Sequence, residues 1–234
     1  MIQFFITGSS SGIGKALALK ALEEGHKVTG ISRRHIIEHP NYHHLSYDLA
    51  DMDSYLKMNF NRNREASKLV LVNNAGWLGE VKPTGKINPD SFKRAYDINL
   101  LAPSVLSKMF VDQTQETGQE RMVINISSGA GAYPVPSWSS YCASKAAINL
   151  FTQVLQTDHP DVKCCAIAPG IVDTEMQGEI RREQEQDFPD KQRFIDYKDK
   201  GELASPEAVA QKIFYLITNP GAIPDVVFSL RDVS

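Results

Sequence analysis

Tyr141 and Lys145 are the residues of this chain whose types and spacing most directly suggest acid–base chemistry. They stand four positions apart, so on a helix they share one face and lie one turn from each other. A lysine ammonium about 4 Å from a phenol, at an effective dielectric of about 20, favours the phenolate by on the order of 4 kcal/mol. Because this spacing occurs by chance in many helices, it predicts a tyrosine with a lowered pKa only where other residues complete a site.

A serine hydroxyl is available close to this pair. We expect a strand to end at Asn125-Ile126-Ser127-Ser128, shortly before the helix that begins near Tyr141. A hydroxyl at that strand end could hydrogen-bond the same substrate oxygen as the tyrosine. The three residue types together predict proton transfer to or from an oxygen of a small molecule.

A glycine-rich turn follows the first predicted strand, in the segment TGSSSGIG that contains Gly8, Gly12 and Gly14. Glycines let the backbone turn sharply and approach a pyrophosphate, and a helix N-terminus offers free N–H groups and a favourable dipole. Strand–turn–helix junctions often need glycine for geometry alone. The position directly after the first strand favours a dinucleotide site over this simpler explanation.

The end of the second predicted strand distinguishes NADP(H) from NAD(H). An acidic residue there would bind the ribose hydroxyls of NAD and repel a phosphate, but the sequence has Ser32-Arg33-Arg34, with Lys15 just after the glycine turn. Two or three cations and one hydroxyl suit a 2′-phosphate through charge-assisted hydrogen bonds. We therefore expect NADP(H).

Short apolar segments alternate with helical patterns along the chain, which predicts βαβ units. The expected strands are Gln3–Thr7, Lys27–Ile31, Leu45–Tyr47, Leu69–Asn73, Met122–Ser127, Val162–Ala168 and Val226–Leu230. The expected helices are Gly12–Glu24, Met52–Phe60, Asp90–Thr114, Ser139–Thr157 and Pro206–Thr218. The strands lack strict alternation, as is typical of strands buried on both faces. This predicts an α/β fold, a Rossmann-type doubly wound parallel sheet of about seven strands with helices on both faces.

No repeat or linker divides the chain, so we expect a single NADP-binding domain over residues 1–234. Two stretches within it look irregular. Arg33–His44 holds four histidines and a proline, and Glu175–Leu203 is densely charged and follows a Pro-Gly turn. A long polar insertion after a strand is a candidate substrate lid, around residues 175–203, or else a solvated surface excursion.

Composition excludes several classes of function. The chain has 234 residues, 42% of them hydrophobic, and a formal net charge of -3, without a basic stripe for nucleic acid. No apolar segment is long enough to cross a bilayer or to serve as a signal peptide, so we expect a cytoplasmic protein. The three cysteines, Cys142, Cys164 and Cys165, suggest neither disulfides nor zinc, and we expect all three to be buried. We expect no metal at the histidines near residues 35–44.

Taken together, these motifs resemble the short-chain dehydrogenases/reductases over nearly the whole chain. The matching residues are Thr7–Gly14, Asn73–Gly76, Asn99, Ser128, Tyr141, Lys145 and Pro169-Gly170, in order and spacing. The resemblance implies that Tyr141 is the general acid and that Lys145 lowers its pKa and holds the nicotinamide ribose. It implies that Ser128, rather than Ser127, orients the carbonyl, and that Asn99 links the lysine to a water relay.

The same resemblance implies a set of cofactor-binding residues. Asp48 would contact the adenine, Asn74 and Ala75 would flank the cofactor, and Ile171 and Thr174 would face the nicotinamide amide. The full expected set is Gly8, Ser10, Ser11, Gly12, Ile13, Gly14, Arg33, Arg34, Asp48, Asn74, Ala75, Gly76, Tyr141, Lys145, Pro169, Gly170, Ile171 and Thr174.

Within that family the chain is most similar to sepiapterin reductases and the microbial benzil reductases. The segments that carry this likeness are NNAGWLGEV at residues 73–81, WSSYCASKAA at 138–147, APGIVDTEMQ at 168–177 and YKDKGEL at 197–203. The likeness implies reduction of vicinal dicarbonyls or α-hydroxy ketones. It places Trp77, Ser128, Gly129, Tyr133, Met176 and Gln177 near the substrate.

One position departs from the sepiapterin reductases. Those enzymes bind the pterin with an aspartate in the last strand, where this chain has Val227, with Asp225 and Asp232 as displaced candidates. The departure favours an aromatic diketone or a broad range of carbonyl substrates over a pterin.

Two other functions stay open from the sequence alone. One is an NADP-linked alcohol or sugar dehydrogenase working in the oxidative direction, and the other is a dinucleotide-sensing regulator without catalysis. The intact set of Asn99, Ser128, Tyr141 and Lys145 disfavours the regulator. The family resemblance also implies a homodimer, packed through the helices at Asp90–Thr114 and Ser139–Thr157.

Overall fold

A parallel β-sheet forms the centre of the computed structural model, which describes residues 1–115 and 118–233. The described residues form seven strands in the order β3-β2-β1-β4-β5-β6-β7, all parallel to their neighbours. The strands are β1 (Ile2–Thr7), β2 (Lys27–Ile31), β3 (Tyr42–Leu45), β4 (Lys68–Asn73), β5 (Glu120–Ile126), β6 (Val162–Ala168) and β7 (Val227–Ser229). This confirms the predicted doubly wound parallel sheet. Its strand order reverses between β1 and β4, where ligands of such folds bind.

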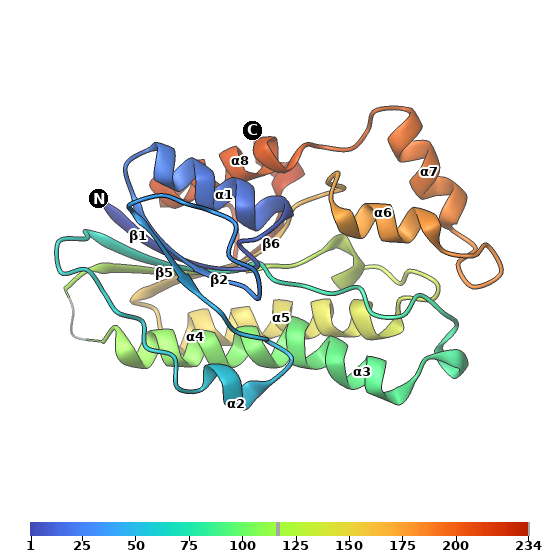
Figure 1. The fold of residues 1–234 in the computed structure, drawn as a ribbon, viewed down its shortest axis with the longest axis horizontal. Helices are drawn as coiled ribbons and strands as arrows, with labels where there is room; N and C mark the ends of the chain where they lie inside the picture. The colour runs from blue at the N-terminus through green and yellow to red at the C-terminus, as the bar shows by residue number, and fades with distance from the viewer. Residues whose placement is uncertain (116–117, 234) are drawn as a thin grey trace.

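Helices cover both faces of the sheet (Figure 1). They are α1 (Gly12–Glu23), α2 (Met52–Tyr55), α3 (Pro89–Tyr96), α4 (Ala102–Gln113), α5 (Ser139–Asp158), α6 (Glu175–Arg182), α7 (Lys191–Asp199) and α8 (Pro206–Thr218). One face is covered by α1 and α8, and the opposite face by α4 and α5. Among the described residues, no helix has both the length and the apolar character needed to span a membrane.

The two layers of core follow from the alternation of side chains along the central strands. In β1, Phe4 and Ile6 point into the core shared with α1 and α8, whereas Phe5 points into the core shared with α4 and α5. All six residues of β1 are buried. Burial on both faces explains why the central strands are continuously apolar.

The single helix predicted over Asp90–Thr114 is interrupted. A π-helical turn at Asp97–Leu101 separates α3 from α4. Pro103 at the start of α4 lacks an N–H, and a proline ring crowds the carbonyl four residues earlier, here that of Asn99. The wider turn relieves this crowding and displaces the backbone around Asn99.

Two other predicted boundaries are wrong. The third strand was expected at Leu45–Tyr47 but is found at Tyr42–Leu45, because a polar edge strand pairs Val28 with Tyr42 and Ile31 with Leu45. The helix expected over Met52–Phe60 ends at Tyr55. After Tyr55 the chain has no regular structure up to β4. A hydrogen bond from the Phe60 N–H to Gln113 Oε1, 2.8 Å long, holds this part of the chain in place.

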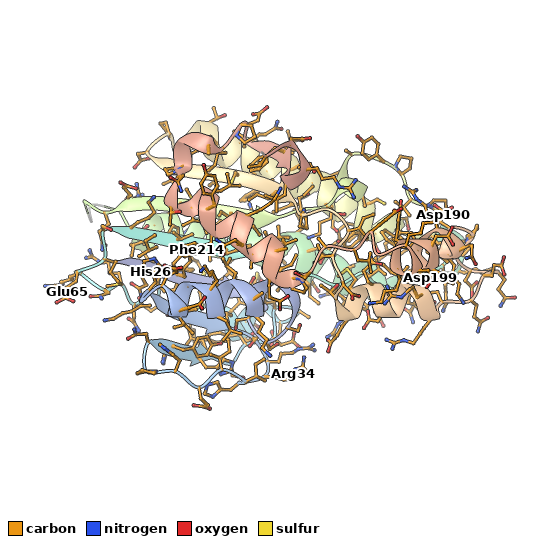
Figure 2. All side chains as sticks on the ribbon, turned by 90° about the horizontal axis from the view of Figure 1, so that it is seen from above. His26, Arg34, Glu65, Asp190, Asp199 and Phe214 are labelled. Carbon is orange, nitrogen blue, oxygen red and sulfur yellow. The ribbon has the colours of Figure 1, made fainter. Side chains whose placement is uncertain are left out.

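We expected the charged stretch Glu175–Leu203 to be irregular, but it contains the two helices α6 and α7. Charged residues hid their helical period, although Ile180 in α6 and Phe194 in α7 are buried. Figure 2 shows Asp190 and Asp199 of this stretch at the opposite end of the molecule from Glu65, which precedes β4. The α6–α7 segment therefore lies toward the carboxyl ends of the strands.

Replacing Gly14 by alanine should destabilise the fold by about 1–3 kcal/mol, because a Cβ there would meet Gly8 O at 2.5 Å and Asn74 Nδ2 at 2.3 Å. Gly178→Ala in α6 is the matched control. Nothing lies within 4 Å of its Cβ position, so helix propensity should stabilise that variant by about 0.5–1 kcal/mol. Urea unfolding of both variants measures the difference, and equal stabilities would contradict the packing described for Gly14.

Candidate active site

A cleft of about 1210 Å³ opens at the carboxyl ends of the strands. Of the residues predicted to form the site, those that line it are Gly8, Ser10, Ser11, Gly12, Ile13, Arg33, Arg34, Asp48, Asn74, Ala75, Gly76, Trp77, Ser128, Gly129, Tyr133, Tyr141, Lys145, Pro169, Gly170, Ile171, Thr174, Met176 and Gln177. Two predicted site residues, Gly14 and Asn99, lie behind its wall. The sheet thus gathers segments that are far apart in sequence into one cavity.

Tyr141 and Lys145 are both buried at the start of α5. The Lys145 ammonium donates to the Ile126 carbonyl at the end of β5 at 2.8 Å and lies 5.6 Å from the centroid of the Tyr141 ring. Burial raises the pKa of Tyr141 to about 12, opposed by its hydrogen bond with Ser128, and burial lowers the pKa of Lys145 to about 8. We expected a lowered phenol pKa, but the pKa is raised, because desolvation outweighs the hydrogen bond with Ser128.

The two candidate serines have different surroundings. Ser128 lines the cleft, hydrogen-bonds Tyr141 and accepts from the Ala130 N–H at 3.2 Å. Ser127 is only 3% exposed, and its hydroxyl donates to Asn149 Oδ1 at 2.5 Å. Of the two, Ser128 is the hydroxyl placed to share a substrate oxygen with the tyrosine.

Asn99 is almost fully buried in the π-helical turn, where protein groups occupy its amide. Its Oδ1 accepts from the Trp77 N–H at 2.8 Å, and its Nδ2 donates to the Trp77 carbonyl at 2.8 Å and to Ser144 Oγ at 3.2 Å. A Cβ on Gly76 would lie 3.5 Å from Asn99 Oδ1 and 3.7 Å from Lys145 Nζ, so Gly76 lies close to both side chains. The arrangement fixes the backbone that carries Trp77 rather than joining Asn99 directly to Lys145.

The glycine turn is tied to the end of β4. Thr7 Oγ1 accepts the N–H groups of Asn74 at 2.9 Å and Ala75 at 3.0 Å, and Asn74 Nδ2 donates to the Thr7 carbonyl at 3.0 Å. Gly8 has a φ of 67°, a conformation that favours glycine. At the N-cap of α1 the Ser11 side chain makes no capping hydrogen bond, which leaves the N–H groups of the first turn facing the cleft. Such a turn suits an anionic group.

A basic wall follows β2. Arg33 and Arg34 are exposed and line the cleft, and none of the ion pairs of the described residues involves either guanidinium. The Ser32 hydroxyl donates to the Arg34 carbonyl at 2.8 Å and so shapes the turn that presents them. Lys15, which we also considered for a phosphate, does not line the cleft. The basic wall therefore has two cations.

Other residues of the cleft were missed from the sequence. They are Arg94 of α3, Trp138 before α5, Arg193, Phe194 and Tyr197 of α7, and Arg231 near the C-terminus. The Arg94 guanidinium lies 5.6 Å from the centroid of the Trp77 ring. One available signal was the position of Trp138, three residues before Tyr141 and therefore on the same side of a helix.

The three positions considered for a pterin-binding aspartate differ in their distance from the cleft. Of Asp225, Val227 and Asp232, only Asp232 is among the described residues that line the cleft. Its Oδ2 accepts from the Ser229 N–H at 3.4 Å within the turn Leu230–Asp232. The carboxylate at the cleft is thus partly engaged with its own backbone.

The cysteines differ in part from the expectation that all three are buried. Cys164 and Cys165 are buried, but Cys142 is partly exposed because it lies beside Tyr141 on the side of α5 that faces Tyr133. Within residues 1–115 and 118–233, no group of three histidine, cysteine, aspartate or glutamate side chains is arranged to hold a metal ion.

Comparisons with known proteins place the chain in one enzyme family. The short chain dehydrogenase family model matches residues 3–185. A benzil reductase ((S)-benzoin forming) of Bacillus cereus is 40% identical over 230 residues, which cover 91% of this chain and 92% of that protein. A sepiapterin reductase of Bos taurus is 35% identical over 155 residues, 65% of this chain and 58% of that protein. The solved structure of the KRED1-Pglu enzyme has a TM-score of 0.78 and 26% identity, and covers 96% of this chain and 97% of that one.

Proposed function

The chain belongs to the short-chain dehydrogenase family of oxidoreductases, and from that premise we propose that it is an NADPH-dependent carbonyl reductase of vicinal dicarbonyl or α-hydroxy-ketone compounds. The family match confirms the resemblance that the motifs predict. The observation that carries the proposal is that Ser128, Tyr141 and Lys145 line the same cleft as the glycine turn.

The residues present fit a dinucleotide. The uncapped N-terminus of α1 suits the diphosphate, and the exposed guanidinium groups of Arg33 and Arg34 suit a 2′-phosphate. Asp48 lines the cleft beyond β3, and the methyl group of Thr174 lies 3.2 Å from the Cβ position of Gly12. When bound, NADPH supplies the hydride that reduces the carbonyl carbon.

Tyr141 supplies the proton. Its raised pKa keeps the phenol protonated at neutral pH, and an alkoxide forming on the substrate is a stronger base than a phenolate, so the proton moves toward it. Ser128 donates a hydrogen bond to the substrate oxygen that receives the proton. Its hydroxyl also hydrogen-bonds Tyr141 and so keeps the phenol directed at that oxygen. The Lys145 ammonium stabilises the phenolate left behind and returns a proton to it, while Asn99 holds the wall at Trp77.

Aromatic side chains of the cleft favour a flat aromatic dicarbonyl. Trp77, Tyr133, Trp138, Phe194 and Tyr197 line it, and the relative with 40% identity is a benzil reductase. Of the three positions considered for a pterin-binding aspartate, only Asp232 lines the cleft among the described residues, and its carboxylate also accepts from the Ser229 N–H. A pterin would therefore be held less well than a benzil-like diketone.

We also propose that residues 1–234 act as one domain whose α6–α7 segment forms a lid, and that two copies form a homodimer. Leu150 and Val154 of α5 are 63% and 50% exposed, and Leu101 before α4 is 39% exposed. These apolar side chains on neighbouring helices suit a subunit interface. Sedimentation of the protein as a monomer at micromolar concentration would contradict the dimer.

Arg33→Ala should weaken NADPH binding by roughly 10- to 100-fold while changing NADH binding little, because only NADPH carries the 2′-phosphate. Arg64→Ala is the matched control, since Arg64 is exposed and does not line the cleft. Fluorescence titration of both cofactors measures the affinities. Equal losses for NADPH and NADH would show that Arg33 does not bind the phosphate.

Oxidation of NADPH in the presence of benzil, sepiapterin or simple ketones tests the substrate class. We expect the highest kcat/KM with benzil, because the aromatic side chains that line the cleft suit its two rings, and only slow turnover of sepiapterin. A strong preference for sepiapterin would mean that Asp232 binds the pterin. No turnover of any carbonyl compound would refute the proposed function.

A further inference from the structure

A cluster of aromatic side chains connects the α6–α7 segment to the proposed proton donor. The Trp138 indole stacks on Phe188, with ring centroids 5.6 Å apart and an interplanar angle of 17°, and contacts Phe194 at 5.3 Å. The Trp138 and Tyr141 rings also meet in a T-shaped contact, with centroids 5.7 Å apart and an interplanar angle of 86°. Phe188 and Phe194 also contact each other at 5.4 Å. A continuous set of ring contacts therefore runs from the segment to Tyr141.

The backbone beside Trp138 is held by the same segment. Ser137 has a φ of 68°, which is rare for a residue with a side chain, and its hydroxyl donates to the Asp187 carbonyl at 2.5 Å. The Ser137 carbonyl accepts the Lys82 N–H at 3.2 Å. Contacts on both the side chain and the backbone thus fix the position of Trp138.

The α6–α7 segment is anchored at its other end to the chain that follows β6. Asp173 pairs with Lys198 of α7 at 2.5 Å and with Arg181 of α6 at 3.9 Å. Val172 forms a parallel bridge with Ala204, and the Asp173 N–H donates to the Ala204 carbonyl at 2.9 Å. The segment is therefore a closed loop that is fixed at its base and docked on Trp138 at its tip.

We propose that Trp138 is a positioning residue, through which the docked α6–α7 segment fixes the ring of Tyr141 and excludes water from its phenol. The inference depends on the proposed function for the role of Tyr141 as proton donor. The contact between the two rings stands independently of it.

The contact between Trp138 and Tyr141 matters for proton transfer because it restricts the tyrosine ring. A tyrosine ring turns about its side-chain torsions, and proton transfer requires the phenol oxygen within hydrogen-bond distance of the substrate oxygen. The indole edge contact limits that rotation. It also contributes to the burial that raises the pKa of Tyr141, so its removal should admit water and shift the phenol pKa downward.

Substitution of Phe188 tests the role of the aromatic cluster without changing a residue that lines the cleft. It is fully buried and does not line the cleft, so it does not reach a substrate there, whereas Phe194 and Trp138 do line it. We expect Phe188→Ala to lower kcat roughly tenfold and Trp138→Ala to lower it on the order of 10- to 100-fold, with KM for a small diketone changing less. Trp138→Phe should retain most of kcat, because it keeps an aromatic ring at the stack.

Phe60→Ala is the matched control. Phe60 is also fully buried and packs edge-on against Phe5 at 5.0 Å and Phe110 at 5.4 Å, in the core under α4. It should lower the melting temperature about as much as Phe188→Ala while leaving kcat unchanged. If Phe188→Ala does not fold, Phe188→Leu carries the same comparison.

Ionisation of the Tyr141 phenol provides a readout that needs no turnover. Ultraviolet difference titration of each variant against the same variant carrying Tyr141→Phe isolates this one phenol. A downward shift of its pKa in Trp138→Ala, restored in Trp138→Phe, together with the fall in kcat, would support the inference. An unchanged phenol pKa, or an unchanged kcat despite a lower melting temperature, would overturn it and leave Trp138 as a core residue. Because the titration needs no substrate, it distinguishes this failure from failure of the proposed function.

Discussion

The hydrogen bond from the Lys145 ammonium to the Ile126 carbonyl is the contact on which the geometry of the site depends. It joins α5 to the carboxyl end of β5 at 2.8 Å, in a place where the lysine is only 4% exposed. A buried ammonium without such a partner would cost several kcal/mol or lose its proton. Tyr141 lies one helical turn before Lys145, and Ser128 follows Ile126 by two residues. This contact therefore ties the helix that carries Tyr141 to the strand end that leads to Ser128, and the Trp138 contact then orients the tyrosine ring.

Much of the fold and most of the cleft could be predicted because their signals are local. Continuous apolar segments identify the central strands, and their buried pattern holds throughout β1 and β4. In a parallel sheet all strand ends meet at one edge, so residues that follow the strands, such as Gly8, Asn74 and Ser128, necessarily approach one another. The family resemblance could then assign roles to positions that spacing alone left undecided.

What could not be predicted depends on contacts between distant segments. Helices α6 and α7 are mostly charged, and their positions depend on long-range contacts, such as that of Phe194 with Trp138 and that of Lys198 with Asp173. The π-helical turn at Asn99 follows from crowding by Pro103, which a helical period does not reveal. The pKa of Tyr141 was expected to fall because a nearby charge was considered without the burial that accompanies it. Lys15 lies close to the glycine turn in sequence but outside the cleft.

We propose above all that Tyr141 donates the proton in an NADPH-dependent carbonyl reduction. Turnover of benzil and binding of NADPH by Tyr141→Phe test it most directly, since the change removes one hydroxyl and keeps the ring against Trp138. We predict that kcat falls by roughly 100- to 10,000-fold while the dissociation constant for NADPH stays within about threefold of the wild-type value. A variant that keeps near wild-type turnover would contradict the assignment of Tyr141 and the mechanism built on it.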